Sequence, residues 1–146
     1  MHPICRATHF LIVCSSICAL GGCSGEERFL PVKGQVFVNG QPLKGATGAI
    51  AFVPDSTKGN ATHHEPRAEI NDAGEYEIKT VGRIGAPPGW YKVQVMAQRE
   101  RLLGSKADMI PRWAVPIEYT KAERTPISIE VVARPESGAY DLKLKR

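Results

Sequence analysis

From residue 32 onward, apolar and polar residues alternate with a period of two through most of the chain. The alternating runs cover residues 32–38, 75–80, 91–97, 127–133 and 140–144. Successive side chains of a β-strand point to opposite faces, so each run predicts a strand with one buried and one solvated face. Residues 49–53 are continuously apolar and predict a more central strand, while residues 67–71 give a weaker signal beside Pro66. About seven short strands predict an all-β fold, a single antiparallel β-sandwich whose two dry faces pack together.

Turn residues separate these runs. Asn39-Gly40 favours the left-handed backbone that a tight hairpin turn needs, and Asn71-Asp72-Ala73-Gly74 suits a type I turn that ends in a left-handed glycine. Most of the prolines fall between the runs, where a missing backbone donor does little harm. The positions of these turn residues and prolines therefore agree with a succession of short antiparallel strands.

One long segment, residues 99–126, has no clear period. We expect a short helical turn around residues 101–103. Its apolar residues suggest that the segment folds back over the sandwich, because a disordered linker would carry fewer such groups. These residues are Leu102, Leu103, Met109, Ile110, Trp113, Val115 and Tyr119.

The N-terminus has a different pattern. A small basic region around Arg6 precedes an apolar run at residues 10–20, which is too short for a permanent transmembrane helix and is typical of a signal peptide. The run closes in Leu20-Gly21-Gly22-Cys23, which resembles the bacterial lipobox, whose cysteine is acylated and becomes the first residue of the mature protein. We therefore expect a signal peptide at 1–22, a lipidated Cys23 with a short tether at 23–30, and one domain at 31–146. The alternatives are an ordinary secreted protein and a buried N-terminal helix.

The cysteines agree with this interpretation. All four, Cys5, Cys14, Cys18 and Cys23, lie in the segment that would be removed or modified, so the exported domain would be held together by burial without an internal disulfide. A metal-binding cysteine cluster is the alternative, but the spacings lie inside an apolar run and fit no zinc pattern.

Charge argues against a nucleic-acid partner. The formal net charge of the 146-residue chain is +4, and its basic cluster is confined to Lys143, Lys145 and Arg146 at the C-terminus. Nucleic-acid-binding proteins concentrate Lys and Arg on one face, often beside stacking aromatic rings. We interpret this cluster as a solvated strand end.

Several runs resemble the opening and later strands of carboxypeptidase regulatory-like domains, which are similar in fold to transthyretin. These runs are residues 32–36 (VKGQV), 39–46 (NGQPLKGA), 52–54 (FVP), 72–76 (DAGEY) and 88–93 (PGWYKV). Residues 115–119, 127–131 and 140–144 resemble the tail of small exported lipoproteins common in planctomycete-type bacteria. The resemblance implies a transthyretin-like sandwich with a non-catalytic role in folding, binding or spacing.

Three features of the sequence bear on catalysis and metal binding. His63, His64 and Glu65, with Asp55 nearby, are candidate metal ligands, but neighbouring side chains of an extended segment diverge, so we expect a polar loop. One transthyretin-like group of hydrolases carries a C-terminal Tyr-Arg-Gly-Ser run, which this chain lacks. No serine lies in a Gly-x-Ser-x-Gly elbow. We therefore predict no catalytic residue, no metal and no cofactor.

Aromatic side chains give the remaining candidate site. Trp90, Trp113 and Tyr119 are a candidate ligand surface, because exposed rings on a sandwich can bind sugars or peptides. The alternative is that the two tryptophans cover the edge of the core. The sequence thus predicts an exported, lipid-anchored protein of the bacterial cell envelope, bound to the membrane through acyl chains on Cys23. Its further partner would be an envelope protein or a polysaccharide. The alternative is a carbohydrate- or peptide-binding module of the cell surface, and a hydrolase or metal-site protein is less favoured.

Overall fold

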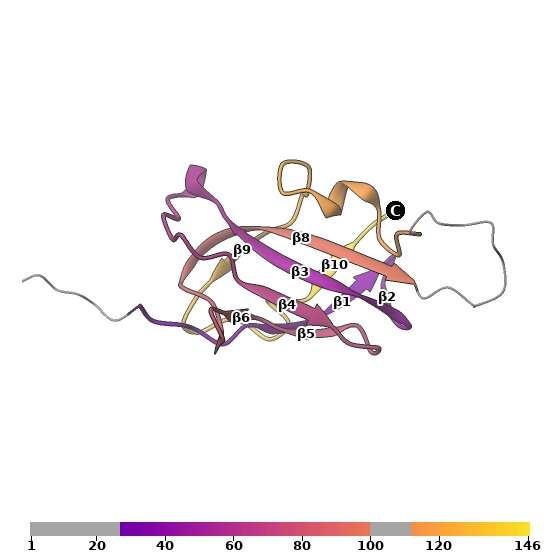
Figure 1. Ribbon diagram of the computed structural model, residues 1–146, viewed down its shortest axis with the longest axis horizontal. Helices are drawn as coiled ribbons and strands as arrows, with labels where there is room; N and C mark the ends of the chain where they lie inside the picture. The colour runs from indigo at the N-terminus through magenta and orange to yellow at the C-terminus, as the bar shows by residue number, and fades with distance from the viewer. Residues whose placement is uncertain (1–26, 100–111) are drawn as a thin grey trace, which may run out of the picture.

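The computed structural model describes residues 27–99 and 112–146 as two packed β-sheets (Figure 1). The predicted all-β sandwich is confirmed. The strands are β1 (Lys33–Val38), β2 (Gln41–Pro42), β3 (Ala46–Pro54), β4 (Arg67–Ile70), β5 (Glu75–Glu77), β6 (Lys79–Thr80), β7 (Arg83–Ile84), β8 (Gly89–Arg99), β9 (Ser128–Val131) and β10 (Leu142–Leu144). Two short 3₁₀ helices, η1 (Ser56–Lys58) and η2 (Ile117–Thr120), complete the described elements.

The larger sheet has six strands in the order β7-β6-β4-β3-β8-β9. Its centre is the antiparallel pair β3–β8, which runs from Ala46 opposite Arg99 to Pro54 opposite Tyr91. The apolar run at 49–53 belongs to β3 and is flanked by strands on both sides, as its composition predicts. Ile50 and Phe52 are fully buried, as are the β8 residues paired with them, Val95 and Val93.

The smaller sheet is built around β1, which pairs with β10, β2 and β5. The β1–β10 pair is parallel, with Val36 opposite Leu142 and Val38 opposite Leu144. The prediction of an antiparallel sandwich is therefore wrong for this one pair. The two strands are separated by nearly the whole domain, so no tight hairpin constrains their relative direction.

The run at 75–80 contains two strands where the sequence predicts one. Residues 75–77 pair with β1 in the smaller sheet, whereas Lys79 pairs with Arg67 of β4 in the larger sheet. The switch occurs at Ile78, whose N–H donates to the carbonyl of Val32 (2.9 Å). Strands that pass between sheets in this way form the corners of a sandwich. This division, with the two-residue strands β2 and β7, accounts for the difference between the seven predicted strands and the ten described here.

The core follows the predicted alternation closely. Tyr76, Ile78 and Thr80 are all buried, as are the alternate residues of β8. The ring of Phe52 lies between those of Tyr76 and Tyr91, with centroid separations of 6.5 and 5.7 Å. Aromatic packing across the two sheets therefore joins them at the middle of the molecule.

Both predicted turns are present. Asn39 and Gly40 have φ values of 50° and 79° and connect β1 to β2 as a type I′ turn. Gly74 has a φ of 81°, and its N–H donates to the carbonyl of Asn71 (2.8 Å). A further hairpin, β6–β7, was not predicted, because the first residue of its turn is Val81 rather than a usual turn residue.

The described part of the long connection closes one side of the sandwich. Ala114 donates its N–H to the carbonyl of Ala97 (2.8 Å), and Val115 is buried. The Tyr119 hydroxyl accepts from the N–H of Lys145 (3.0 Å), which joins η2 to the end of the smaller sheet. The prediction that this segment folds back over the core is confirmed for residues 112–126. The helical turn expected at 101–103 lies outside the described residues.

The predicted signal peptide and Cys23 also lie outside the described residues. Leu30, placed at the end of the tether in the prediction, is buried and pairs with Ala86. The core therefore begins at residue 30. No helix within residues 27–99 and 112–146 is long and apolar enough to cross a membrane.

Candidate functional site

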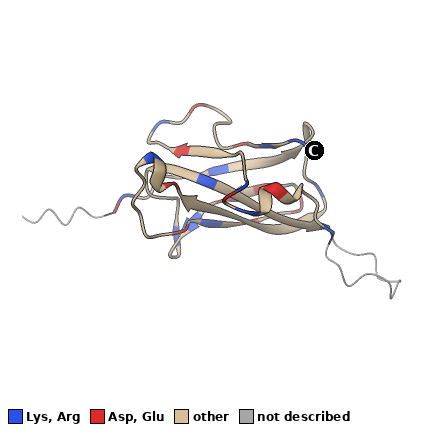
Figure 2. Cartoon of the chain, turned by 90° about the horizontal axis from the view of Figure 1, so that it is seen from above, with Lys and Arg blue, Asp and Glu red and all other residues tan. Residues whose placement is uncertain are grey.

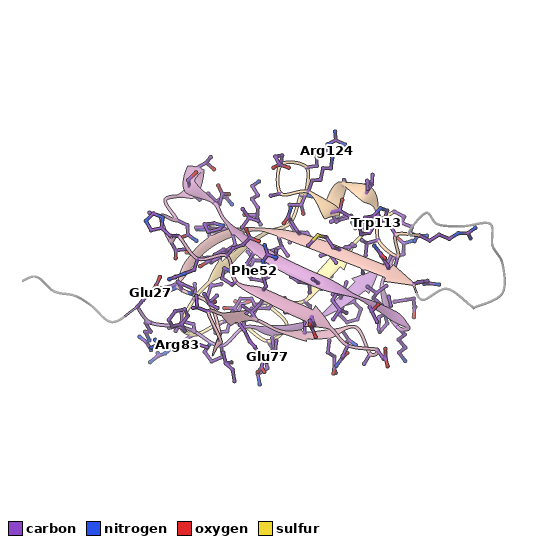
Figure 3. All side chains as sticks on the ribbon, viewed as in Figure 1. Glu27, Phe52, Glu77, Arg83, Trp113 and Arg124 are labelled. Carbon is purple, nitrogen blue, oxygen red and sulfur yellow. The ribbon has the colours of Figure 1, made fainter. Side chains whose placement is uncertain are left out.

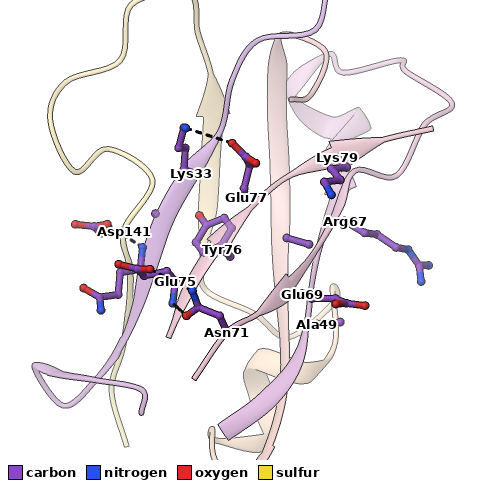
Figure 4. Close-up of a pocket in the computed structure, with 13 residues that line it drawn as sticks. Lys33, Ala49, Arg67, Glu69, Asn71, Glu75, Tyr76, Glu77, Lys79 and Asp141 are labelled. Carbon is purple, nitrogen blue, oxygen red and sulfur yellow. Dashed lines mark hydrogen bonds and ion pairs between the residues drawn. The ribbon is translucent and has the colours of Figure 1, made fainter. Parts of the chain in front are cut away.

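A hollow of about 1030 Å³ lies where the two sheets separate (Figure 4), and we call it the seam groove. Its walls are the first half of β1 with β5 on one side and β4 on the other. β4 and the chain that follows it are joined at two points. Arg67 at the start of β4 pairs with Lys79 of β6, and the Asn71 N–H after β4 donates to the Glu75 carbonyl (3.0 Å). Between these points β5 pairs with β1, away from β4, and the groove follows this gap.

Charges of both signs line the seam groove. The cations are Lys33, Arg67 and Lys79, and the carboxylates are Glu69, Glu75, Glu77 and Asp141. Several are already partnered: the Lys33 ammonium lies 3.2 Å from a Glu77 oxygen, and Asp141 accepts from the Gln35 N–H (3.1 Å). Figure 2 shows the same interspersion of positive and negative residues over the strands of the described chain. A groove of mixed charge suits a polar or zwitterionic segment better than a polyanion.

Tyr76 lies at the seam groove, but its hydroxyl has a structural role. The hydroxyl donates to the carbonyl of Tyr140 (2.5 Å), which links β5 to the segment before β10. Burial, reinforced by the negative charge of Asp141, raises the pKa of Tyr76 well above its usual range. The hydroxyl therefore stays protonated near neutral pH and does not serve as a base or nucleophile.

A second hollow, of about 600 Å³, lies beside Trp90 and residues 58–62. The Lys58 ammonium lies 3.8 Å from the centroid of the Trp90 ring and donates to the hydroxyl of Ser128 (2.8 Å). This arrangement is a cation–π contact. Because Lys58 covers one face of the indole, that face is not free to stack on a sugar ring.

The three predicted aromatic residues lie at different places. Trp90 is near the start of β8 and half-buried, whereas Trp113 pairs with Gln98 near the end of the same strand. Eight residues of extended strand separate these positions, a distance of about 26 Å. Trp113 is 38 % exposed, while Tyr119 is only 5 % exposed and its hydroxyl accepts from the Lys145 N–H. The structure therefore does not bring the three rings together on one surface.

The candidate metal ligands also diverge. His63 is exposed, while His64 turns toward Glu27, with 3.0 Å between its Nε2 and a Glu27 oxygen. Asp55 is buried and caps η1, where its Oδ1 accepts from the N–H and the hydroxyl of Thr57 (3.1 and 2.6 Å). Across the part of the chain that the structure describes, no three His, Cys, Asp or Glu residues are placed to hold a metal ion.

The Asp55 cap gives a pH-dependent prediction. The hydrogen bond from the Thr57 hydroxyl lowers the pKa of Asp55 below its ordinary value of 3.8, and Lys92 and Lys58 lower it further. A carboxylate with a depressed pKa in the folded state stabilises the fold above its unfolded pKa, and this contribution is lost as pH falls through the folded pKa. We expect Asp55→Asn to lower the urea midpoint at neutral pH, with a difference from wild type that shrinks below pH 3.8. A difference that is constant across the acid range would contradict this role for the carboxylate.

Comparisons with protein-family models, with curated proteins and with solved structures give no match to this chain. The proposed function of this chain therefore rests on its sequence and on the geometry of the described residues. Sequence reasoning missed the seam groove and the β6–β7 hairpin. The charged residues Glu75, Glu77 and Lys79 were a signal for the seam groove. The sequence did not show, however, that the strand divides here and opens the groove.

Proposed function

We propose that this protein is a lipid-anchored component of a bacterial cell envelope, attached to the membrane by acyl chains on Cys23. The observation that carries the proposal is the spacing between the lipobox-like Leu20-Gly21-Gly22-Cys23 and the fold. Leu30, the first residue of the core, follows Cys23 by only seven positions. A short tether of this kind would hold the sandwich close to the membrane that receives the anchor.

The chemistry of the described domain supports export. Every cysteine of the chain lies at or before residue 23, so a processed domain has no thiol that an oxidising compartment could modify. The buried apolar cluster extends from Leu30 to Leu144 and supplies stability through packing. The two packed sheets also agree with the transthyretin-like fold that the resemblance to carboxypeptidase regulatory-like domains implies.

The proposal assigns the domain a structural or binding role without a reaction. A binding module of the cell surface is the second candidate, and the seam groove favours it because an open hollow of mixed charge is available beside two strands. A peptide segment with charges of both signs fits this groove better than a neutral sugar. Capture of defined envelope peptides by the wild-type domain, lost when Glu75 is replaced by lysine, would separate a binding role from a purely structural one.

Extraction of the native protein tests the anchor. An acylated protein should remain in the membrane fraction through washes with high salt and alkaline carbonate, because apolar chains hold it, and should be released by detergent. A protein held by surface charge would leave the membrane in high salt. Release without detergent would contradict the proposed anchor.

A further inference from the structure

The β6–β7 hairpin presents apolar side chains to solvent. Val81 is 79 % exposed and Ile84 is 56 % exposed, the two highest values among the exposed large apolar residues of the described chain. Residues 81–84, which we call the hairpin tip, are all exposed. Apolar residues gathered at an exposed tip mark a contact surface more often than apolar residues scattered singly.

The backbone of Val81 supports a role beyond folding. Val81 and Gly82 have φ values of 48° and 78°, and they connect Thr80 to Arg83 as a type I′ turn. The same turn between β1 and β2 has nearly identical values, 50° and 79°, but uses Asn39 and Gly40. A left-handed backbone is costly for a β-branched residue, and asparagine is preferred at this position. The fold alone therefore favours asparagine over valine at position 81.

The tip is flanked by positive charge. Lys79 and Arg83 are exposed, and residues 78–89 contain no carboxylate. Neither cation is in an ion pair with another described residue, whereas the nearby carboxylates of Glu77 and Glu27 are paired with Lys33 and His64. The guanidinium of Arg83 lies 5.4 Å from the centroid of the Phe29 ring. An apolar tip with unpaired cations is complementary to an anionic lipid surface.

The tip lies at the end of the molecule from which the tether leaves. Figure 3 shows Arg83 and Glu27 at the same end of the sandwich, and the contact of Arg83 with Phe29 confirms this proximity. Four residue steps separate Cys23 from Glu27, so the anchor can be no more than about 14 Å from Glu27 whatever the conformation of the chain between them. A membrane reached by Cys23 is therefore within reach of the tip.

We propose that the hairpin tip is a second membrane contact, in which Val81 and Ile84 enter the interface of an anionic bilayer while Lys79 and Arg83 bind its headgroups. This inference rests on the proposed lipid anchor. A single attachment point leaves a domain free to rotate, whereas an anchor and a tip together orient the sandwich. The seam groove and η2 would then keep a fixed direction relative to the membrane.

A matched pair of isoleucines tests the contact. Ile84→Cys and Ile117→Cys place a single free thiol at sites of 56 % and 51 % exposure in the mature protein, whose Cys23 sulfur is acylated. Ile117 lies in η2, which packs near the C-terminus through Tyr119 and Lys145. Each variant is labelled with an environment-sensitive fluorophore and reconstituted into vesicles of phosphatidylethanolamine and phosphatidylglycerol. We expect a blue shift and quenching by spin-labelled lipid at position 84 and neither at position 117.

The outcomes separate this inference from the anchor itself. Flotation with the vesicles but an unquenched label at position 84 would overturn the tip contact and leave the anchor intact. Failure to float would overturn both. A blue shift without quenching by lipid would indicate a protein partner or a second copy, and equal quenching in neutral phosphatidylcholine vesicles would contradict an anionic surface.

A second variant tests the membrane contact of the hairpin tip without destabilising the fold. Val81→Asn gives the β6–β7 turn the same first residue as the β1–β2 turn, so the urea midpoint should rise. The same substitution should reduce lipid quenching at position 84, because it removes the apolar side chain at the tip. A stabilised variant with undiminished quenching would show that Val81 is not part of the contact.

Discussion

Replacing Phe52 with alanine is expected to destabilise the domain by about 3–5 kcal/mol. Phe52 is fully buried in the central strand β3, and its ring contacts those of Tyr76 and Tyr91 from both sheets. Truncation would leave a cavity at the junction of the two sheets, and the surrounding strands can collapse into it only partly. Because domains of this size are stable by about 5–15 kcal/mol, the loss is a large share of the total. Urea denaturation followed by tryptophan fluorescence measures it.

Phe37→Ala is the matched control for this prediction. Phe37 also lies in a strand, β1, but it is only half-buried and is not part of the core cluster. We expect it to cost less than about half as much, because less apolar surface is lost from the interior. Equal effects for the two phenylalanines would mean that the sheets do not pack through Phe52.

Replacing Cys23 with alanine is expected to move the protein from the membrane fraction to the soluble fraction. Each buried methylene of an acyl chain contributes about 0.8 kcal/mol, so two or three chains hold a protein stably where a single chain holds it marginally. Without the sulfur no chain is attached. The hairpin tip alone, with two apolar side chains, is too small a surface to retain the domain. Fractionation of the native envelope followed by immunoblotting checks this.

Cys18→Ala is the control for the anchor. Cys18 lies in the same apolar region, five residues before Cys23, and in the proposal it belongs to the removed segment. Its loss should leave membrane retention unchanged. Release of both variants to the same extent would point to a general disturbance of export, and retention of Cys23→Ala would contradict acylation at that sulfur.

The sequence predicted most of the strands because alternation reports burial directly. The period of two requires burial at alternate positions, and the structure buries Val32, Val36, Tyr76 and Ile78. The Asn-Gly turn at 39–40 has the expected left-handed backbone. The same period could not show that residues 75–80 change sheets at Ile78, since the side chains keep alternating through the corner. The parallel pairing of β10 was equally hidden, because it depends on a contact between strands more than 100 residues apart.

The site was predicted less well than the fold, for a physical reason. Trp90, Trp113 and Tyr119 were grouped by their chemistry, but the length of β8 separates the two tryptophans and packing buries Tyr119. The seam groove arises from the separation of β4 and β5, which no local pattern encodes. Val81 was overlooked because valine is a poor residue for a turn, which is the same property that now makes it informative.

The decisive measurement for acylation at Cys23 is the intact mass of the native protein, extracted from its membrane with detergent. Acylation at Cys23 predicts a chain that starts at Cys23, after loss of residues 1–22, and that carries the mass of a diacylglycerol group on the cysteine. A chain that retains the leader, or that starts at another residue with no acyl mass, would contradict the proposed anchor and the membrane contact that depends on it.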